Sequence, residues 1–193
     1  RSDPNYLDIK EFIKPSLHEK LLEELKCDYE VIVYKRDPKT KLAPKEYKAL
    51  HPVGTSPILE IDGHMLPETN AIIDYLLARF PNKLRPTPSE QEFQKYNYWF
   101  HAGQGTLMPI LTMSFVFYTV TQKVPFFLKP ILKKVSSEIH KMMINPRIHG
   151  VLKTMESDLT NVNYLAGNEI SAADISMSYT LEVTDVRIGL NDY

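Results

Sequence analysis

The first half of the chain mixes two hydrophobic periods, one typical of strands and one typical of helices. The apolar residues at 7–13 and the β-branched and aromatic residues at 30–34 predict two strands, with an amphipathic helix over 17–26 between them. A strand, a helix and a strand at this spacing form a parallel, right-handed crossover. After a polar loop, Pro44 suits the first turn of a short helix over 45–50.

A hairpin pattern comes next, where two short apolar runs flank Asp62-Gly63. This arrangement predicts two antiparallel strands joined by a tight turn. Apolar residues then recur at helical spacing from Ile72 to Phe80, which predicts a helix that closes the unit. Residues 1–80 are therefore expected to form a small α/β domain.

Residues 81–88 mark a linker, because their three prolines stiffen the chain and prevent a helix. Beyond them no strand pattern competes with helix. We therefore expect residues 89–193 to form an all-α domain, whose C-terminal end is incomplete at Tyr193. The predicted fold class is α/β followed by all-α.

Prolines and caps divide the helices of this second domain. A first long helix is expected to kink at Pro109, and a later helical stretch is expected to be interrupted at Pro146. Ser171 and Asp174 form a variant of the capping box, which predicts the start of a buried helix and requires no catalytic role.

The stretch around Pro57 has the features of a site for a small peptide. A proline at the head of a strand cannot donate to the ladder, and a cis Ser56–Pro57 bond would turn the Ser56 main chain outward, toward an extended peptide at the sheet edge. Glu68 and Thr69 lie at a helix N-terminus, where unpaired N–H groups attract a carboxylate. The main chain of Ser56 would hold the middle of the peptide, and Glu68 with Thr69 would hold its α-amino and α-carboxylate end.

Three motifs in this order resemble the glutathione transferase family. They are Gly54-x-Ser56-Pro57-Ile58-Leu59 with the following Asp62-Gly63, then Pro67-Glu68-Thr69-Asn70-Ala71-Ile72-Ile73, and Gly167-x-x-Ile170-Ser171-Ala172-Ala173-Asp174-Ile175. The resemblance covers residues 7–186 and is strongest to the fungal members. It implies a thioredoxin-like N-terminal domain followed by an all-helical C-terminal domain, and it implies glutathione, bound as a substrate, as the peptide.

The resemblance also implies an activity. Members of the family conjugate the glutathione thiolate to hydrophobic electrophiles, and some are glutathione-dependent peroxidases. They are typically cytoplasmic homodimers that act in detoxification and against oxidative stress. The alternative is a non-catalytic glutathione-transferase-like module for regulation or assembly. The first helix favours that alternative, because it is shorter than the family's and lacks its usual arginine.

Conjugation needs a group that lowers the pKa of the glutathione thiol, because a free thiol with a pKa of about 8.5 is mostly protonated at neutral pH. The family places this group just after the first strand, where Ser16 stands as the candidate catalytic residue. Ser16 is equally well interpreted as an ordinary helix N-cap. Cys27 lies at the other end of that helix, and we expect it to be buried and inert.

Two further sets of residues complete the predicted site. Lys41 occupies a position where the family often has a basic residue for the glycine carboxylate, although a loop lysine is typically solvated. One side of the long helix provides a lining for an apolar second substrate, namely Tyr98, His101, Gln104 and Met108. His101 and Met108 have an alternative interpretation as core residues.

Charge and metal-ligand patterns narrow the range of partners. The formal net charge is −1 at pH 7, and no dense Lys/Arg stripe indicates nucleic acid. Lys129, Lys133 and Lys134 are interpreted as a solvated helix face. A single cysteine favours a reducing compartment. The six histidines are scattered, so we expect no metal site.

The segment 102–122 carries no charged residue and approaches the length of a bilayer span. Glycines, Pro109 and hydroxyl side chains dilute its apolar character, which favours a buried helix beside an apolar cleft over a membrane span. Peripheral membrane contact stays open as a second interpretation.

Overall fold

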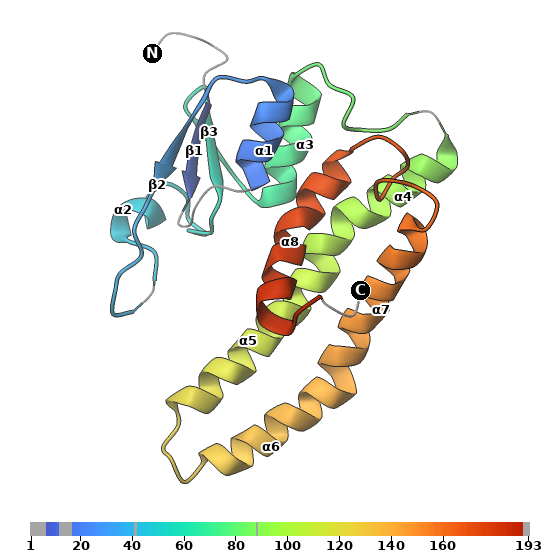
Figure 1. Ribbon diagram of the computed structural model, residues 1–193. Helices are drawn as coiled ribbons and strands as arrows, with labels where there is room; N and C mark the ends of the chain where they lie inside the picture. The colour runs from blue at the N-terminus through green and yellow to red at the C-terminus, as the bar shows by residue number, and fades with distance from the viewer. Residues whose placement is uncertain (1–6, 12–16, 41, 88, 191–193) are drawn as a thin grey trace. The chain divides into compact units, whose positions relative to one another are not determined.

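Figure 1 shows the fold as a computed structural model, which describes residues 7–11, 17–40, 42–87 and 89–190. The chain divides into two compact units, with the division between Arg85 and Pro86. Each unit is described separately below.

The first unit is the α/β crossover and hairpin that the sequence predicts. Its elements are β1 (Leu7–Glu11), α1 (Leu17–Leu25), β2 (Tyr29–Val33), α2 (Lys45–Lys48), β3 (Ile58–Ile61), β4 (His64–Pro67) and α3 (Thr69–Arg79). The sheet has the order β2-β1-β3-β4, with β1 parallel to β2 and the other neighbours antiparallel. Helices α1 and α3 lie on one side of this sheet and α2 on the other (Figure 1). The short helix predicted over 45–50 ends two residues early, at Lys48.

The core of the first unit comes from the positions that the helical and strand periods predict. It contains Leu21, Leu22, Ile58, Leu59, Ile72, Ile73 and Leu76, all fully buried. Arg79 at the end of α3 donates to the Asp62 carboxylate at 3.0 Å and to the Tyr75 hydroxyl at 2.9 Å. Asp62 forms the turn of the β3–β4 hairpin, so this contact fixes the hairpin against α3.

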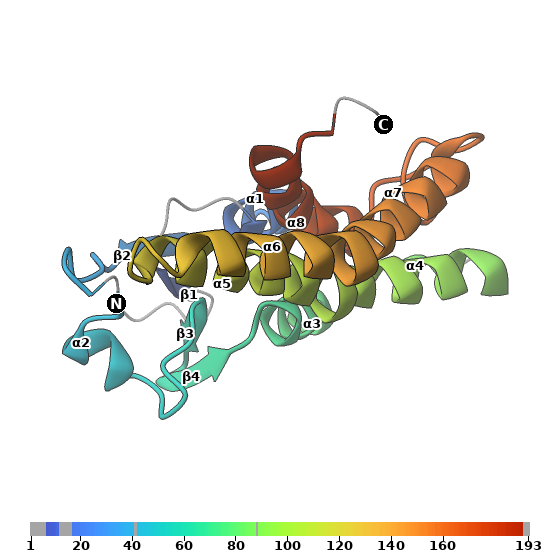
Figure 2. The same cartoon turned by 90° about the horizontal axis from the view of Figure 1, so that it is seen from below.

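The second unit consists of helices. Its elements are α4 (Glu90–Ala102), a π-helical segment η1 (Gly103–Leu107), α5 (Met108–Lys123), α6 (Lys129–Ile139), a second π-helical segment η2 (His140–Ile144), α7 (Asn145–Leu159) and α8 (Ala172–Ile188). Figures 1 and 2 show α4 continuing into α5, and α6 continuing into α7, as two long helices that lie side by side.

The interruption expected at Pro146 is wrong, because neither proline ends its helix; a widened, π-helical turn precedes each of them. Segment η1 ends two residues before Pro109, and η2 ends two residues before Pro146. A proline has no N–H to donate, and its ring crowds the carbonyl four residues earlier, so the preceding turn opens from α to π geometry. The helical path therefore passes through both prolines.

Two hydrogen-bonded groups fix the packing of the second unit. Trp99 is fully buried, and its indole N–H donates to the Asp158 carboxylate at 2.9 Å, which links α4 to α7. At the start of α8, the Asp174 carboxylate accepts hydrogen bonds from the Ser171 N–H at 2.8 Å, the Ser171 hydroxyl at 2.6 Å and the Leu165 N–H at 2.8 Å. The predicted capping box is therefore confirmed. Within the ranges that the structure describes, no helix is both long enough and apolar enough to cross a membrane.

Candidate functional site

The pairing of β3 with β4 brings the two halves of the predicted peptide site together. In this register Ile58 lies opposite Pro67, so Pro57 and Glu68, the next residue along each chain segment, lie at the same end of the hairpin, where β4 gives way to α3. The Ser56–Pro57 peptide bond is cis, as the sequence predicts. Residues eleven to thirteen positions apart in the chain are therefore neighbours at one end of the hairpin.

The sheet-edge part of the prediction needs a correction. Strand β3 pairs with β1 on one side and with β4 on the other, so it is not an edge strand. Among the described residues, the segment just before β3 has no neighbouring strand, because both ladders begin at Ile58. Within the described ranges the main chain of Ser56 makes no hydrogen bond, so both its N–H and its C=O are available to a ligand.

The loop that leads into Pro57 is held by α2. Tyr47 is fully buried, and its hydroxyl donates to the Thr55 carbonyl at 3.1 Å. Gly54 adopts φ 64°, and its N–H donates to the His51 carbonyl at 2.9 Å in a tight turn. The exposed Ser56 backbone is therefore positioned by a buried side chain that sequence reasoning did not identify, since Tyr47 carries no motif of its own.

Glu68 has an unusual backbone conformation, with φ 78° and ψ 120°. For a residue with a Cβ this region is strained, at a cost of about 1–3 kcal/mol, and such residues are often found at functional sites. Glu68 is exposed, and within the described part of the chain its carboxylate takes part in no hydrogen bond or ion pair. An exposed carboxylate on a strained backbone is well suited to bind a ligand ammonium group.

The N-terminus of α3 provides the complementary anion site. The first bond inside the helix runs from the Ile72 N–H to the Glu68 carbonyl at 3.0 Å, so the N–H groups of Thr69 and Ala71 precede the internal ladder. The first turn contains no acidic side chain that would compete for them. These groups and the positive end of the helix dipole favour a carboxylate.

A cationic hollow lies in the same unit, around the loop after β2. Its volume is about 480 Å³, and its lining includes Lys35, Arg36, Lys45 and Lys48. Lys41 lies between these residues in the sequence but outside the described residues, as does Ser16, so the structure gives no position for either. The lysines of this hollow were not predicted as site residues, because sequence alone does not distinguish them from solvated loop lysines.

Cys27 is half-buried, and its thiol donates to the Leu25 carbonyl at 3.7 Å. Burial, and then the charge of Asp28, raise the pKa of this thiol above its usual value. Cys27 is therefore a poor nucleophile at neutral pH. Among the described residues no group of three or more His, Cys, Asp or Glu side chains is placed to hold a metal ion.

The four residues predicted to line the second-substrate site fall on three elements. Tyr98 and His101 are exposed on α4, Gln104 lies in η1, and Met108 opens α5. His101 is therefore not a core residue, which excludes that alternative. The π-helical turn of η1 adds a residue to the helix, so Met108 is rotated away from the position that regular α-helical spacing predicts.

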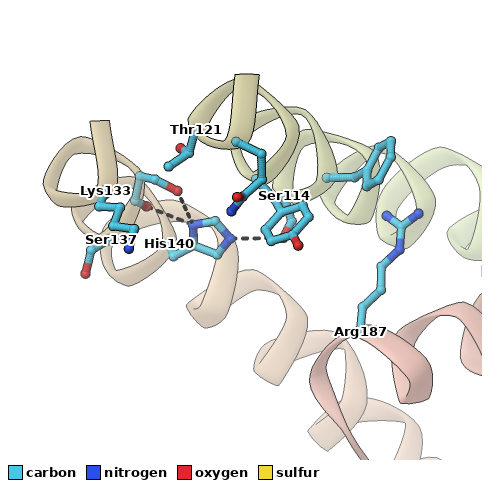
Figure 3. A pocket seen from close by; sticks show the side chains of 10 residues that line it. Ser114, Thr121, Lys133, Ser137, His140 and Arg187 are labelled. Carbon is cyan, nitrogen blue, oxygen red and sulfur yellow. Dashed lines mark hydrogen bonds between the residues drawn. The ribbon is translucent and has the colours of Figure 1, made fainter. Parts of the chain in front are cut away.

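The helical unit also contains a cavity of about 720 Å³ between α5 and α6, which Figure 3 shows with the end of α8 beside it. His140 and Ser114 point toward one another across it, with 2.9 Å between the His140 Nε2 and the Ser114 Oγ. The His140 Nδ1 lies 2.8 Å from the Ser136 carbonyl oxygen, which can only accept, so Nδ1 donates to it; in a neutral imidazole Nε2 then accepts from the Ser114 hydroxyl. The Arg187 guanidinium lies 4.8 Å from the centre of the Phe115 ring.

This cavity was missed in the sequence because its lining comes from three separate parts of the chain, namely 114–122, 133–140 and Arg187. Ser114 and Phe115 belong to the uncharged segment 102–122, which the sequence indicates as the wall of an apolar cleft. That pattern was the signal in the sequence that pointed to a cavity beside this helix. Ser136 and His140 are one helical turn apart, but His140 becomes a neighbour of Ser114 only through the pairing of the two long helices.

Comparisons with known proteins agree with this architecture. Residues 19–87 match the family model described as the glutathione S-transferase N-terminal domain. Glutathione S-transferase 3 of Schizosaccharomyces pombe is 30% identical over 162 residues, which cover 83% of this chain and 66% of that protein. Glutathione S-transferase 1 of Saccharomyces cerevisiae is 29% identical over 176 residues, which cover 86% of this chain and 75% of that protein. The chain thus spans two thirds to three quarters of the length of these relatives.

A solved glutathione S-transferase from Actinobacillus pleuropneumoniae has the same fold, with a TM-score of 0.70 and 24% sequence identity. The match covers 97% of this chain and 81% of that one. The fold class predicted from the sequence, a thioredoxin-like unit followed by an all-helical unit, is therefore confirmed.

Proposed function

Because the chain belongs to the glutathione S-transferase family, we propose that its first unit binds glutathione and that the protein conjugates the glutathione thiolate to hydrophobic electrophiles. The observation that supports this proposal is the β3–β4 register, because it sets the cis Pro57 and Glu68 at the same end of the hairpin. Within the described residues the main chain of Ser56 makes no hydrogen bond. The two yeast relatives are named glutathione S-transferases, which supports glutathione as the substrate.

Each part of glutathione has a chemically matched group in this proposal. The peptide centre pairs with the N–H and C=O of Ser56. The α-ammonium binds the Glu68 carboxylate, and the adjacent α-carboxylate binds the N–H groups at Thr69 and the start of α3. The glycine carboxylate lies toward the lysine-lined hollow, where Lys41 is the proposed partner.

The thiol is activated at the start of α1 in this proposal. The Ser16 hydroxyl donates a hydrogen bond to the sulfur, and the helix N-terminus favours the anion. Each unit by which these effects lower the thiol pKa corresponds to about 1.4 kcal/mol. The acceptor binds beside Tyr98, His101, Gln104 and Met108, and an organic hydroperoxide in the same place would make the protein a glutathione peroxidase. The protein acts as a cytoplasmic homodimer in detoxification and against oxidative stress.

A second candidate function is a non-catalytic module that keeps the glutathione site and serves regulation or assembly. The observation that favours it is the first helix, whose described part, α1, spans nine residues. A shortened helix presents fewer groups near the sulfur, while the Glu68 and Thr69 site is unaffected. Binding of glutathione without turnover distinguishes this candidate from the enzyme.

The test combines glutathione binding by calorimetry with the rate of conjugation to a generic chromogenic electrophile. Glu68→Ala removes a charge-assisted hydrogen bond of about 1.5–3 kcal/mol, so glutathione affinity should fall about 10- to 100-fold. Glu46→Ala, which removes an exposed carboxylate from the first turn of α2 in the same unit, should leave both measurements unchanged.

Ser16→Ala should keep the affinity and lose most of the rate. Unchanged rate in Ser16→Ala would remove Ser16 from the mechanism but leave the site in place. Measurable affinity without turnover in the parent would favour the module. Unchanged affinity in Glu68→Ala would contradict the binding site itself.

A further inference from the structure

The connection between α5 and α6 is unusually basic for a protein with nearly balanced charge. Residues 120–135, which we call the hairpin tip, contain four lysines and no Asp or Glu. The wider stretch 93–137 also lacks any acidic residue. An anionic partner would therefore meet no repulsive carboxylate within this stretch, because the nearest acidic residue of α6, Glu138, lies toward the other end of that helix.

The hairpin tip also exposes large apolar side chains. Phe126 is 83% exposed and Phe127 is 63% exposed, with their rings in edge-to-face contact at 5.8 Å between centroids. The connection is a tight turn, closed by the Leu128 N–H donating to the Pro125 carbonyl at 3.0 Å. A turn this short cannot fold back over the helices, so both rings project from it.

Helix α6 extends the exposed apolar surface. Ile131 and Val135 are four residues apart, and both are exposed on one face of the helix. Among its described residues α6 buries none of its side chains. Figure 1 shows the α5–α6 pair reaching past the end of α8, so within this unit no other helix covers the tip.

We propose that the hairpin tip docks the protein onto an anionic phospholipid surface. Phe126, Phe127 and Ile131 insert into the boundary between head groups and acyl chains, while the lysines remain among the head groups. Each lysine near such a surface contributes about 1 kcal/mol of attraction. The proposed contact is peripheral, with the hairpin tip at the membrane surface.

The charge pattern favours this occupant over a second copy of the chain. In a symmetric dimer formed through the hairpin tip, the same patch faces itself, which would bring the lysines of both copies together without a carboxylate to pair with them. An anionic lipid surface satisfies the apolar and the cationic groups at once. The proposed lipid contact is made by the hairpin tip, which overlaps the uncharged segment 102–122 only at residues 120–122. This contact does not depend on glutathione binding.

The test is co-sedimentation of the full chain with vesicles of phosphatidylcholine, with and without phosphatidylserine. We expect binding to the anionic vesicles that weakens with added salt. Lys129→Gln and Lys134→Gln should each lower the partition coefficient about fivefold, corresponding to about 1 kcal/mol per lysine. The matched control is Lys153→Gln, an exposed lysine on α7, which should change nothing.

The apolar contribution is tested by the double variant Phe126→Ser, Phe127→Ser, which should lower binding by about tenfold or more. Its control is Val186→Ser, because Val186 is 88% exposed but lies on α8. Circular dichroism confirms that each variant is folded. Equal binding to neutral vesicles, unchanged binding of the phenylalanine variant, or a lipid-free change of oligomeric state in that variant would overturn the proposal.

Discussion

Glu68 combines a strained backbone with a carboxylate that is proposed to bind the ligand. Substitutions at this one residue can therefore change fold stability and glutathione binding independently. Its φ of 78° and ψ of 120° cost about 1–3 kcal/mol with a Cβ present. Glycine relieves much of that strain, while its greater freedom in the unfolded chain costs about 0.5–1 kcal/mol. We therefore expect Glu68→Gly to raise the free energy of unfolding by about 1 kcal/mol, equivalent to a Tm increase of about 2–4 °C.

The assay pairs thermal denaturation with glutathione calorimetry in three variants. Glu68→Ala keeps the strain, so it should unfold like the parent while binding glutathione as weakly as Glu68→Gly. Glu46→Gly is the control for the substitution itself, because it places glycine in an ordinary helical position on α2 and should lower stability by about 0.5–1 kcal/mol. A loss of stability in Glu68→Gly equal to that in Glu46→Gly would refute the argument from strain.

Three further predictions concern the rest of the fold. Asp174→Asn should lower the free energy of unfolding, measured in urea, by about 2–4 kcal/mol, because three hydrogen bonds converge on this carboxylate. A change of less than about 0.5 kcal/mol would show that these hydrogen bonds do not stabilise the start of α8. Trp99→Phe keeps most of the packing but removes the donor to Asp158, so we expect a loss of about 1–2 kcal/mol in the same assay, and no loss would show that the bond is dispensable. The raised pKa of Cys27 leaves less thiolate at neutral pH, so iodoacetamide should modify Cys27 more slowly than free cysteine, and the rate should increase as the pH rises toward that pKa. Mass spectrometry measures the rate of modification, and a rate equal to that of free cysteine would contradict the raised pKa.

Local patterns were sufficient to predict the elements of the first unit and the position of Pro57 and Glu68 at one end of the hairpin. The turn at Asp62-Gly63 fixes the hairpin register, and the register alone brings Pro57 next to Glu68. The buried face of α3 follows from its helical spacing, and the capping box at Ser171 follows from residues three positions apart. In each case the determining residues are close in sequence.

The features that the sequence did not reveal depend on distant contacts or on a choice between similar geometries. The bond between Ser114 and His140 exists only because α5 packs beside α6. A proline indicates a disturbed helix, but it does not distinguish a break from the π-helical turns found before Pro109 and Pro146. The strain at Glu68 arises where a strand turns directly into a helix, and glutamate itself gives no sign of it.

The central claim is the proposal that glutathione binds to the main chain of Ser56 and to the start of α3. The most direct test is a titration of ¹⁵N-labelled protein with glutathione, followed by the backbone amide signals. The account predicts saturable shifts that are largest at Ser56, Glu68 and Thr69 and that share one dissociation constant. Shifts confined to other residues, or none at these three while glutathione binds, would contradict it.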